Sequence, residues 1–212
     1  IKLPKIKSVE SKPVDTQRRL LVAGLGWLSI SAPLAYLGFG APKAGANTIT
    51  LPRLFACAQQ AQQHYLVCVD QQGETLFSIP LPARGHGMAL HPSLPLGVVF
   101  ARRPGQFMLA FDPLTGATLS QQQMPPDRHG YGHGCFDAEG LLYVSEGVSQ
   151  NSAGVIAVYD PANHFAQRAA FTGFGIGPHE IVLHPDQQHL IVAVGGIQTD
   201  GRDDLNIATM AP

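Results

Sequence analysis

The stretch Tyr131-Gly132-His133-Gly134 has two counterparts in the chain, Arg84-Gly85-His86-Gly87 and Gly177-Pro178-His179-Glu180. Their histidines are separated by 133 − 86 = 47 and 179 − 133 = 46 residues. Short apolar runs and turns follow each copy, and later runs close on an aromatic residue and an aspartate, as in Phe111-Asp112 and Tyr159-Asp160. A period of this length, built from several short apolar runs, is typical of the blades of a β-propeller.

The blade pattern is most complete in the second unit. We predict four strands there, from the inner to the outer: Gly87–Leu90, Leu96–Ala101, Phe107–Phe111 and Ala117–Gln122. The segment Asp112-Pro113-Leu114-Thr115-Gly116 predicts a turn, because aspartate accepts hydrogen bonds from turn amides and glycine permits positive φ. No long segment has a helical period, so the fold class is all-β.

The other units are read in the same way. Three strands, Leu54–Ala58, His64–Val69 and Thr75–Pro80, are expected to form the outer part of a first blade. The third unit has Leu141–Ser145 and a turn at Asp160–Asn163, and the fourth runs from His179 through His184-Pro185-Asp186 to Ile191–Val194. The sequence therefore predicts a propeller of four-stranded blades, with about three and a half blades in this chain.

The N-terminal part differs in composition from the rest. All lysines lie at or before Lys43, and the pair Arg18-Arg19 precedes an apolar stretch from Leu20 to Gly40 that is followed by Ala44-Gly45-Ala46. This order is typical of a secretory signal, and the arginine pair resembles a twin-arginine signal. We therefore expect a signal region at 1–46, a partial propeller domain at 47–212, and a periplasmic location. The alternative is a single membrane anchor, so contact with a membrane is expected only through an uncleaved signal.

Charge and cysteine content narrow the possible functions. From Asn47 onward seven arginines face thirteen acidic residues, a net charge of 7 − 13 = −6, which argues against a nucleic-acid partner. Cys57 and Cys68 lie symmetrically about a predicted turn at Ala61–His64, so they either form a disulfide across a hairpin or are buried separately. Cys135 is expected to be an unpaired strand residue.

Several ordered motifs together resemble domain-of-unknown-function family 1513. They are Pro82–Gly87, Phe100–Gly105, Phe111-Asp112, Tyr131–Gly134, Gly154–Asp160, Gly175–Glu180 and Val194–Ile197. The resemblance covers about residues 50–212 and implies an exported, periplasmic, seven-bladed propeller of a Gram-negative bacterium, of which this chain is a fragment. It implies a setting beside imelysin-like and di-haem-peroxidase-like proteins in iron-acquisition loci, and no established enzymatic activity. The chain departs from the family in a shortened loop at Thr199–Asp204.

The three repeated histidines are the candidate site. The innermost strand of each blade lines the axis of a propeller, so His86, His133 and His179 are expected to converge from successive blades. Neutral imidazoles that converge on one point suit copper, zinc or iron. Two alternatives stay open: a funnel that binds a polar ligand, and a structural role in which each ring bonds the main chain of a neighbouring blade.

Other residues are candidates for the mouth of the same channel. Glu180 is expected to add a carboxylate ligand, to orient an imidazole, or to pair with Arg84 or Arg103. Tyr131 joins this tentative set, and His129 is a weaker candidate for the rim. The pair Arg102-Arg103 lies at a predicted turn, where it is expected either to bind an anion or simply to be solvated. The remaining histidines are interpreted as turn or surface residues: His64, His91, His164, His184 and His189.

Motifs of the common catalytic classes are absent from the sequence. It contains no Gly-x-Ser-x-Gly elbow, no Cys-x-x-Cys pair and no phosphate-binding glycine loop between a strand and a helix. We therefore expect a binding or scaffold protein linked to iron or metal acquisition, with periplasmic iron-uptake or redox proteins as partners. The alternative is a metal-dependent redox enzyme that uses the axial histidines, and no catalytic residue is assigned.

Overall fold

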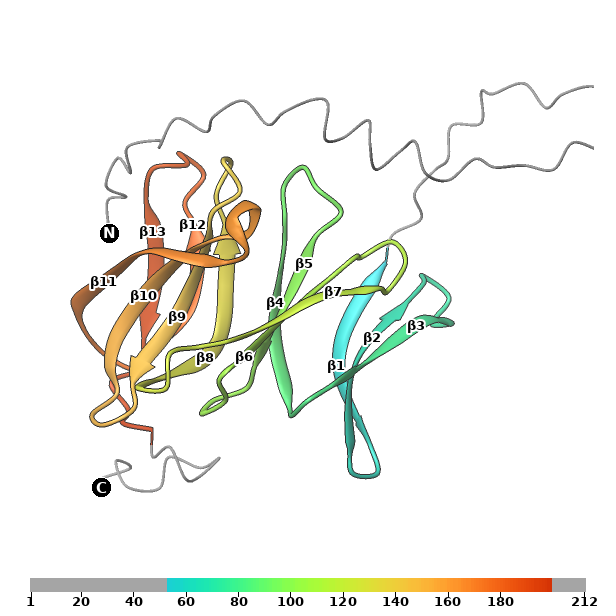
Figure 1. The fold of residues 1–212 in the computed structure, drawn as a ribbon, viewed down its shortest axis with the longest axis horizontal. Helices are drawn as coiled ribbons and strands as arrows, with labels where there is room; N and C mark the ends of the chain where they lie inside the picture. The colour runs from blue at the N-terminus through green and yellow to red at the C-terminus, as the bar shows by residue number, and fades with distance from the viewer. Residues whose placement is uncertain (1–52, 200–212) are drawn as a thin grey trace, which may run out of the picture. The chain divides into compact units, whose positions relative to one another are not determined.

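The computed structural model describes residues 53–199, which form antiparallel β-sheets joined by short turns (Figure 1). A three-stranded sheet contains β1 (Leu54–Gln60), β2 (Gln63–Val69) and β3 (Thr75–Leu81). The next sheet contains β4 (Gly85–Leu90), β5 (Gly97–Ala101), β6 (Phe107–Phe111) and β7 (Thr118–Gln123). A second four-stranded sheet contains β8 (Arg128–Phe136), β9 (Leu142–Val148), β10 (Ala153–Asp160) and β11 (Ala166–Ile176). The last pair is β12 (Pro178–Leu183) with β13 (Leu190–Val194).

Each four-stranded sheet has its strands side by side in chain order, which is the arrangement of a propeller blade. The first strands of successive sheets are neighbours, since β8 packs against both β4 and β12. The three-stranded sheet corresponds to the second, third and fourth strands of a blade, because Val69-Asp70 ends β2 as Phe111-Asp112 ends β6. The all-β propeller fold predicted from the repeat is confirmed.

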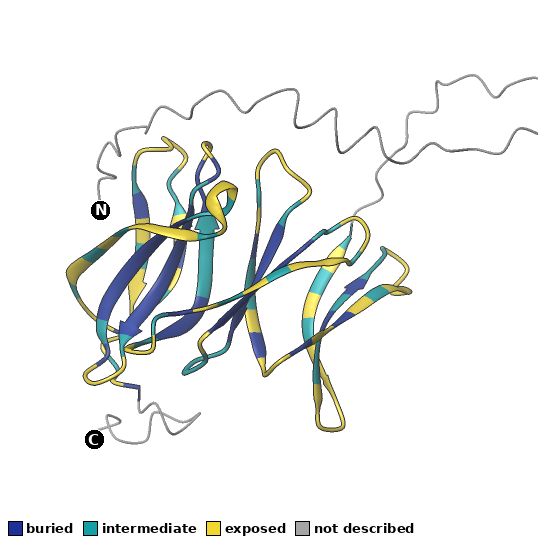
Figure 2. Cartoon of the chain, viewed as in Figure 1, coloured by how far each residue is buried: buried dark blue, intermediate teal, exposed yellow. Residues whose placement is uncertain are grey.

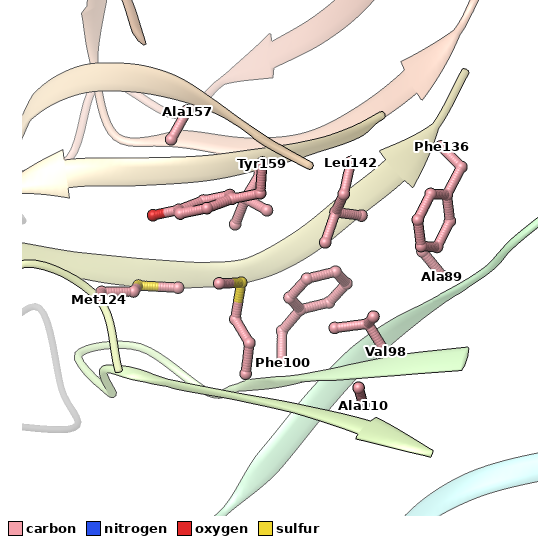
Figure 3. Close-up of a cluster of buried hydrophobic side chains, with 11 residues drawn as sticks. Ala89, Val98, Phe100, Ala110, Met124, Phe136, Leu142, Ala157 and Tyr159 are labelled. Carbon is pink, nitrogen blue, oxygen red and sulfur yellow. The ribbon is translucent and has the colours of Figure 1, made fainter. Parts of the chain in front are cut away.

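The core lies between blades, and strand alternation divides it into two clusters. Every residue of β5 and β6 is buried (Figure 2). Val99 and Leu109 belong to a cluster shared with β2 and β3, whereas Val98 and Phe100 belong to a cluster shared with β9 and β10. In the second cluster the ring of Phe100 points toward Leu142 (Figure 3). The two faces of one middle strand therefore join neighbouring blades, because successive side chains point to opposite faces.

The turns follow the predicted chemistry. Oδ1 of Asp112 accepts hydrogen bonds from the amides of Leu114 (2.7 Å) and Thr115 (3.2 Å), and Gly116 has φ +78°. Oδ1 of Asp137 does the same for the amides of Glu139 and Leu141. The turn predicted at Asp160–Asn163 contains a short 3-10 helix, Pro161–Asn163.

The first hairpin corrects one expectation. The turn between β1 and β2 lies one residue earlier than predicted, at Gln60–Gln63 instead of Ala61–His64, since Gln60 pairs with Gln63 and Ala61 has φ +52°. Cys57 therefore lies opposite Leu66 rather than Cys68, and all three cysteines are free. The disulfide alternative is wrong, and Cys57 and Cys68 are separate, at least partly buried residues.

No helix in the described part of the chain could span a bilayer. The predicted signal region, 1–46, lies outside the described residues.

Candidate functional site

Three neighbouring strands supply the candidate site. His86 lies on β4, His133 on β8 and His179 on β12. Their strand pairing is irregular at each histidine, with register shifts between Gly85 and Met88, between Gly130 and Gly134, and between Pro178 and Ile181. Such bulges re-aim a side chain out of the regular strand alternation. The histidines therefore lie within the inner strands, at local irregularities that the sequence did not reveal.

The three imidazoles are close together. The ring centroid of His133 lies 4.4 Å from that of His179 and 4.8 Å from that of His86. The centroids of His86 and His179 are 5.9 Å apart. One ring nitrogen of each histidine lies within 4.8 Å of the others. Three nitrogen atoms that bind one zinc ion tetrahedrally lie about 3.4 Å from one another. Each of the three rings would therefore have to move toward the common centre by less than about 1 Å for all three to bind one ion.

His133 is the most restrained of the three rings. Its Nδ1 lies 2.9 Å from Oε2 of Glu180, and its side chain is 14% exposed. Its Nε2 is buried and has no hydrogen-bond partner among the described residues. A neutral ring that donates its Nδ1–H to the carboxylate keeps the Nε2 lone pair available, and this is how a carboxylate orients a metal-binding histidine.

All three histidines favour the neutral form. Burial lowers the pKa of His133 to about 4, although Glu180 acts in the opposite direction. Burial, His179 and the arginines lower the pKa of His86, while burial and Arg103 lower the pKa of His179. Neutral imidazole is the form that binds a metal ion, so the site needs no deprotonation near neutral pH.

Glycines beside the histidines allow the strands to approach. A Cβ on Gly87 would lie 2.5 Å from the main-chain oxygen of Gly132. Gly132 has φ +90°, and a Cβ there would lie 2.7–3.1 Å from atoms of His86. The Gly-His-Gly pattern therefore reflects contact between the main chain of one blade and the histidine of the next.

The charges of the predicted arginines act on the histidines. Glu180 contacts Nδ1 of His133, and no ion pair between Glu180 and Arg84 is formed among the described residues. Arg84 instead lines a polar pocket of about 380 Å³ beside His86. The charge of Arg103 acts on both His86 and His179.

Tyr131 is placed differently from the other candidates. Its side chain is 1% exposed, and its ring packs edge-on against His129 at a centroid distance of 5.0 Å. A Cβ on Gly147 would lie 2.9 Å from its hydroxyl, so Gly147 leaves the space that the hydroxyl occupies. The ring of Tyr131 therefore contacts His129 and the strand that contains Gly147, and His129 is buried rather than at a rim.

A buried acidic residue was not anticipated. Glu146 on β9 is 0% exposed; its Oε1 accepts a 2.6 Å hydrogen bond from the hydroxyl of Tyr159, and its Oε2 lies 3.6 Å from Arg128. Burial raises the pKa of Glu146 to about 7. The sequence signal was a lone acidic residue inside an apolar strand, Leu142–Val148.

A second group, His184, Asp186 and His189, also has metal-ligand residue types within 4.8 Å. Oδ2 of Asp186 lies 3.1 Å from Nδ1 of His184 and 2.6 Å from Nδ1 of His189. Nδ1 of His184 also accepts a hydrogen bond from the main-chain N–H of Asp186. In the same way, Nδ1 of His91 accepts hydrogen bonds from the main-chain N–H groups of Ser93 and Leu94. These histidine turns stabilise hairpins, in agreement with the sequence-based interpretation of His91 and His184.

Similar solved structures share the fold and little sequence. The chain is similar to hydrazine synthase of Kuenenia stuttgartiensis, with a TM-score of 0.52 and 14% identity over 74% of this chain and 47% of the other. It is also similar to a gluconolactonase, XC5397 of Xanthomonas campestris, with a TM-score of 0.48 and 19% identity over 63% and 42%. A third similar structure is BamB of Moraxella catarrhalis, with a TM-score of 0.44 and 14% identity over 68% of this chain and 40% of the other. The chain thus spans about half the length of the first of these structures, or less for the other two.

No curated protein matches the sequence. A family model described as "Protein of unknown function (DUF1513)" matches residues 79–212, which include all three histidines of the site and more than half of the chain. The chain therefore belongs to the DUF1513 family.

Proposed function

We propose that this propeller binds a transition-metal ion, copper, iron or zinc, through His86, His133 and His179. The observation that carries the proposal is the state of His133: Glu180 holds its Nδ1 at 2.9 Å, and its Nε2 is buried without a hydrogen-bond partner in the described residues. A buried unpartnered nitrogen is unfavourable unless something binds it. A metal ion bound to this nitrogen would remove this penalty.

The proposed role is that of an exported binding protein in periplasmic metal handling, with iron-uptake or redox proteins as partners. Support comes from the basic and apolar N-terminal segment and from the donor set of the site. Three imidazoles without a thiolate suit reversible binding of copper, iron or zinc.

Elemental analysis tests the proposal. The protein is purified from the periplasm, and its metal content is compared with that of a His86→Ala/His133→Ala/His179→Ala variant. A matched control is His184→Ala/His189→Ala, which removes histidines from the turn group and leaves the site intact. We expect about one metal ion per chain in the wild type and the control, and none in the triple variant. Metal-free wild-type protein that also fails to take up Cu²⁺, Fe²⁺ or Zn²⁺ would overturn the proposal.

A second candidate function is that of a metal-dependent redox enzyme. The observation that favours it is the number of ligands, because three protein nitrogens leave a coordination position open, as catalytic sites do. Reversible oxidation and reduction of bound copper or iron by a chemical mediator would support this candidate. A site that binds only zinc would exclude it.

A further inference from the structure

The strand that carries His133 has the widest interruption of strand pairing among the three strands of the site. Three residues of β8, Tyr131–His133, lie opposite a single residue of β9, Ser145. At the other two histidines, two residues of the inner strand lie opposite one residue of its partner. An interrupted ladder takes main-chain groups away from their regular partners. The position of the main chain at His133 therefore depends on contacts other than the regular strand pairing.

Ser145 supplies a contact of this kind. Its hydroxyl donates a 3.1 Å hydrogen bond to the main-chain oxygen of His133, and its side chain is fully buried. The residues at the corresponding place in the other two blades are Phe100 and Ala193, whose side chains have no hydrogen-bond donor. Burying a hydroxyl costs free energy unless it is hydrogen-bonded. The bond to a candidate metal ligand therefore accounts for a polar residue at a place that is apolar in the other blades.

The residues on either side of His133 make this hydrogen bond important. Both are glycines, and Gly132 has φ +90°. Glycine restricts the main chain less than any other residue, so the local sequence does little to fix the peptide planes that direct the His133 side chain. The Ser145 hydroxyl fixes the main chain from β9. Glu180 restrains the ring from β12, at 2.9 Å from Nδ1.

We infer that Ser145 is a positioning residue of the metal site, because its hydroxyl holds the main chain of His133 in the conformation that directs Nε2 toward an ion shared with the other two histidines. The inference rests on the metal site proposed above and adds to it a residue that does not touch the ion. Ser145 acts on the main chain of the ligand, whereas Glu180 acts on its ring. Loss of the hydroxyl leaves all three imidazoles in the protein and loosens their common geometry.

The expected effect of Ser145→Ala is weaker and less regular metal binding. Removing a residue that supports a metal ligand usually weakens binding by about 10- to 100-fold. Ser145 acts further from the ion than Glu180 does, so we expect Zn²⁺ to bind about 10-fold more weakly. Coordination geometry determines the visible spectrum of Co²⁺, which absorbs more strongly in a tetrahedral site than with six ligands. A loosely held His133 should therefore also reduce the absorption of bound Co²⁺.

Tyr143→Phe is the matched control. Tyr143 precedes Ser145 by two positions on β9, its side chain is also buried, and its hydroxyl also donates a 3.1 Å hydrogen bond, to Asp137. Each variant leaves an acceptor with one hydrogen bond fewer, so each should unfold at a lower urea concentration than the wild type. Because the hydroxyl of Tyr143 bonds Asp137 and not His133, Ser145→Ala alone should change the metal site.

The experiment compares the full chain with its two variants by titration of Zn²⁺ against a chelator, by the visible spectrum with Co²⁺ and by urea unfolding. We expect Tyr143→Phe to bind both ions as the wild type does, and Ser145→Ala to bind Zn²⁺ about 10-fold more weakly with reduced Co²⁺ absorption. Wild-type affinity in Ser145→Ala, or an equal loss of affinity in both variants, would overturn the inference and leave the metal site standing. A wild-type protein that binds neither ion would refute the metal site and the inference with it.

Discussion

Glu180 on β12 lies 2.9 Å from Nδ1 of His133 on β8, so a carboxylate of one blade orients a histidine of its neighbour. The Glu180 side chain is 53% exposed, whereas that of His133 is 14% exposed. The carboxylate therefore contributes little to packing, and its main effect is on the ring that it touches. Glu180 therefore affects the chemistry of the site more than it affects the stability of the fold.

The first prediction follows from this contact. Glu180→Ala should weaken metal binding by about 10- to 100-fold, the usual effect of removing a carboxylate behind a metal-binding histidine. Glu180→Gln should lie between the wild type and the alanine variant, because its amide oxygen still accepts the Nδ1–H without a charge. The measurement is a competition titration with a metal chelator. Glu139→Ala, in an exposed turn, is the control. Equal affinity in all four proteins would show that Glu180 does not position the ring.

The second prediction concerns the close approach of β4 and β8. Gly132→Ala should destabilise the protein more than Gly73→Ala, although both glycines have similar φ values, +90° and +84°. A Cβ on Gly73 meets nothing within 4 Å, so its cost is conformational, about 1–2 kcal/mol. A Cβ on Gly132 also meets His86 and displaces it. Urea unfolding should show the difference, and only Gly132→Ala should lose metal. Retention of a full complement of metal by Gly132→Ala would contradict the described geometry.

The sequence predicts the strands well where apolar runs end at strong turn signals. The predicted strand Phe107–Phe111 agrees with β6 at both ends, and the predicted strand Ile191–Val194 ends where β13 ends and begins one residue later than β13. Aspartates and glycines delimit many of these runs, so the local chemistry determines where a strand stops. The turn at Gln60–Gln63 lacks glycine, proline, asparagine and aspartate, which explains why its position was predicted one residue too late.

The sequence predicts only part of the site. The repeat period places one histidine on each of three inner strands, and the topology then makes those strands neighbours. The irregular pairing at each histidine depends on contacts between blades, so it leaves no local pattern. For the same reason the sequence could not decide whether Glu180 contacts His133 or an arginine.

The third prediction concerns Glu146 and pH. Its pKa is raised to about 7 in the folded protein from an ordinary value of 4.5. Between these values the folded state holds a proton that the unfolded state has lost, so the contribution of Glu146 to stability falls as pH rises from 4.5 through 7. The full change is on the order of 3 kcal/mol.

Glu146→Gln tests this directly, because glutamine stays neutral and keeps an acceptor for Tyr159. The free energy of unfolding of the variant should increase relative to that of the wild type by up to about 3 kcal/mol between pH 5 and pH 8, because only the wild type loses stability over this range. Glu139→Gln should show no such trend. A difference between wild type and Glu146→Gln that does not change with pH would mean that Glu146 is already ionised at pH 5.

The fourth prediction concerns how a glycine and an aromatic ring share space between two strands. Gly97 on β5 lies opposite Phe111 on β6, and a Cβ on Gly97 would lie 2.5 Å from the Phe111 ring. The ring is fully buried and packs 5.7 Å from the ring of Phe55 on β1, so it also joins the first two blades. Gly97→Ala should destabilise by about 1–3 kcal/mol through overpacking, and Phe111→Leu should destabilise by leaving a cavity.

The double variant Gly97→Ala/Phe111→Leu distinguishes a shared space from two independent defects. The added methyl group partly fills the volume that the smaller side chain vacates, so the double variant should be more stable than the sum of the single effects by about 0.5–3 kcal/mol. Urea unfolding of the four proteins gives this coupling energy. Additive effects would mean that Phe111 is held by Phe55 and its other neighbours, and that the absence of a side chain at Gly97 serves the strand pairing rather than the ring.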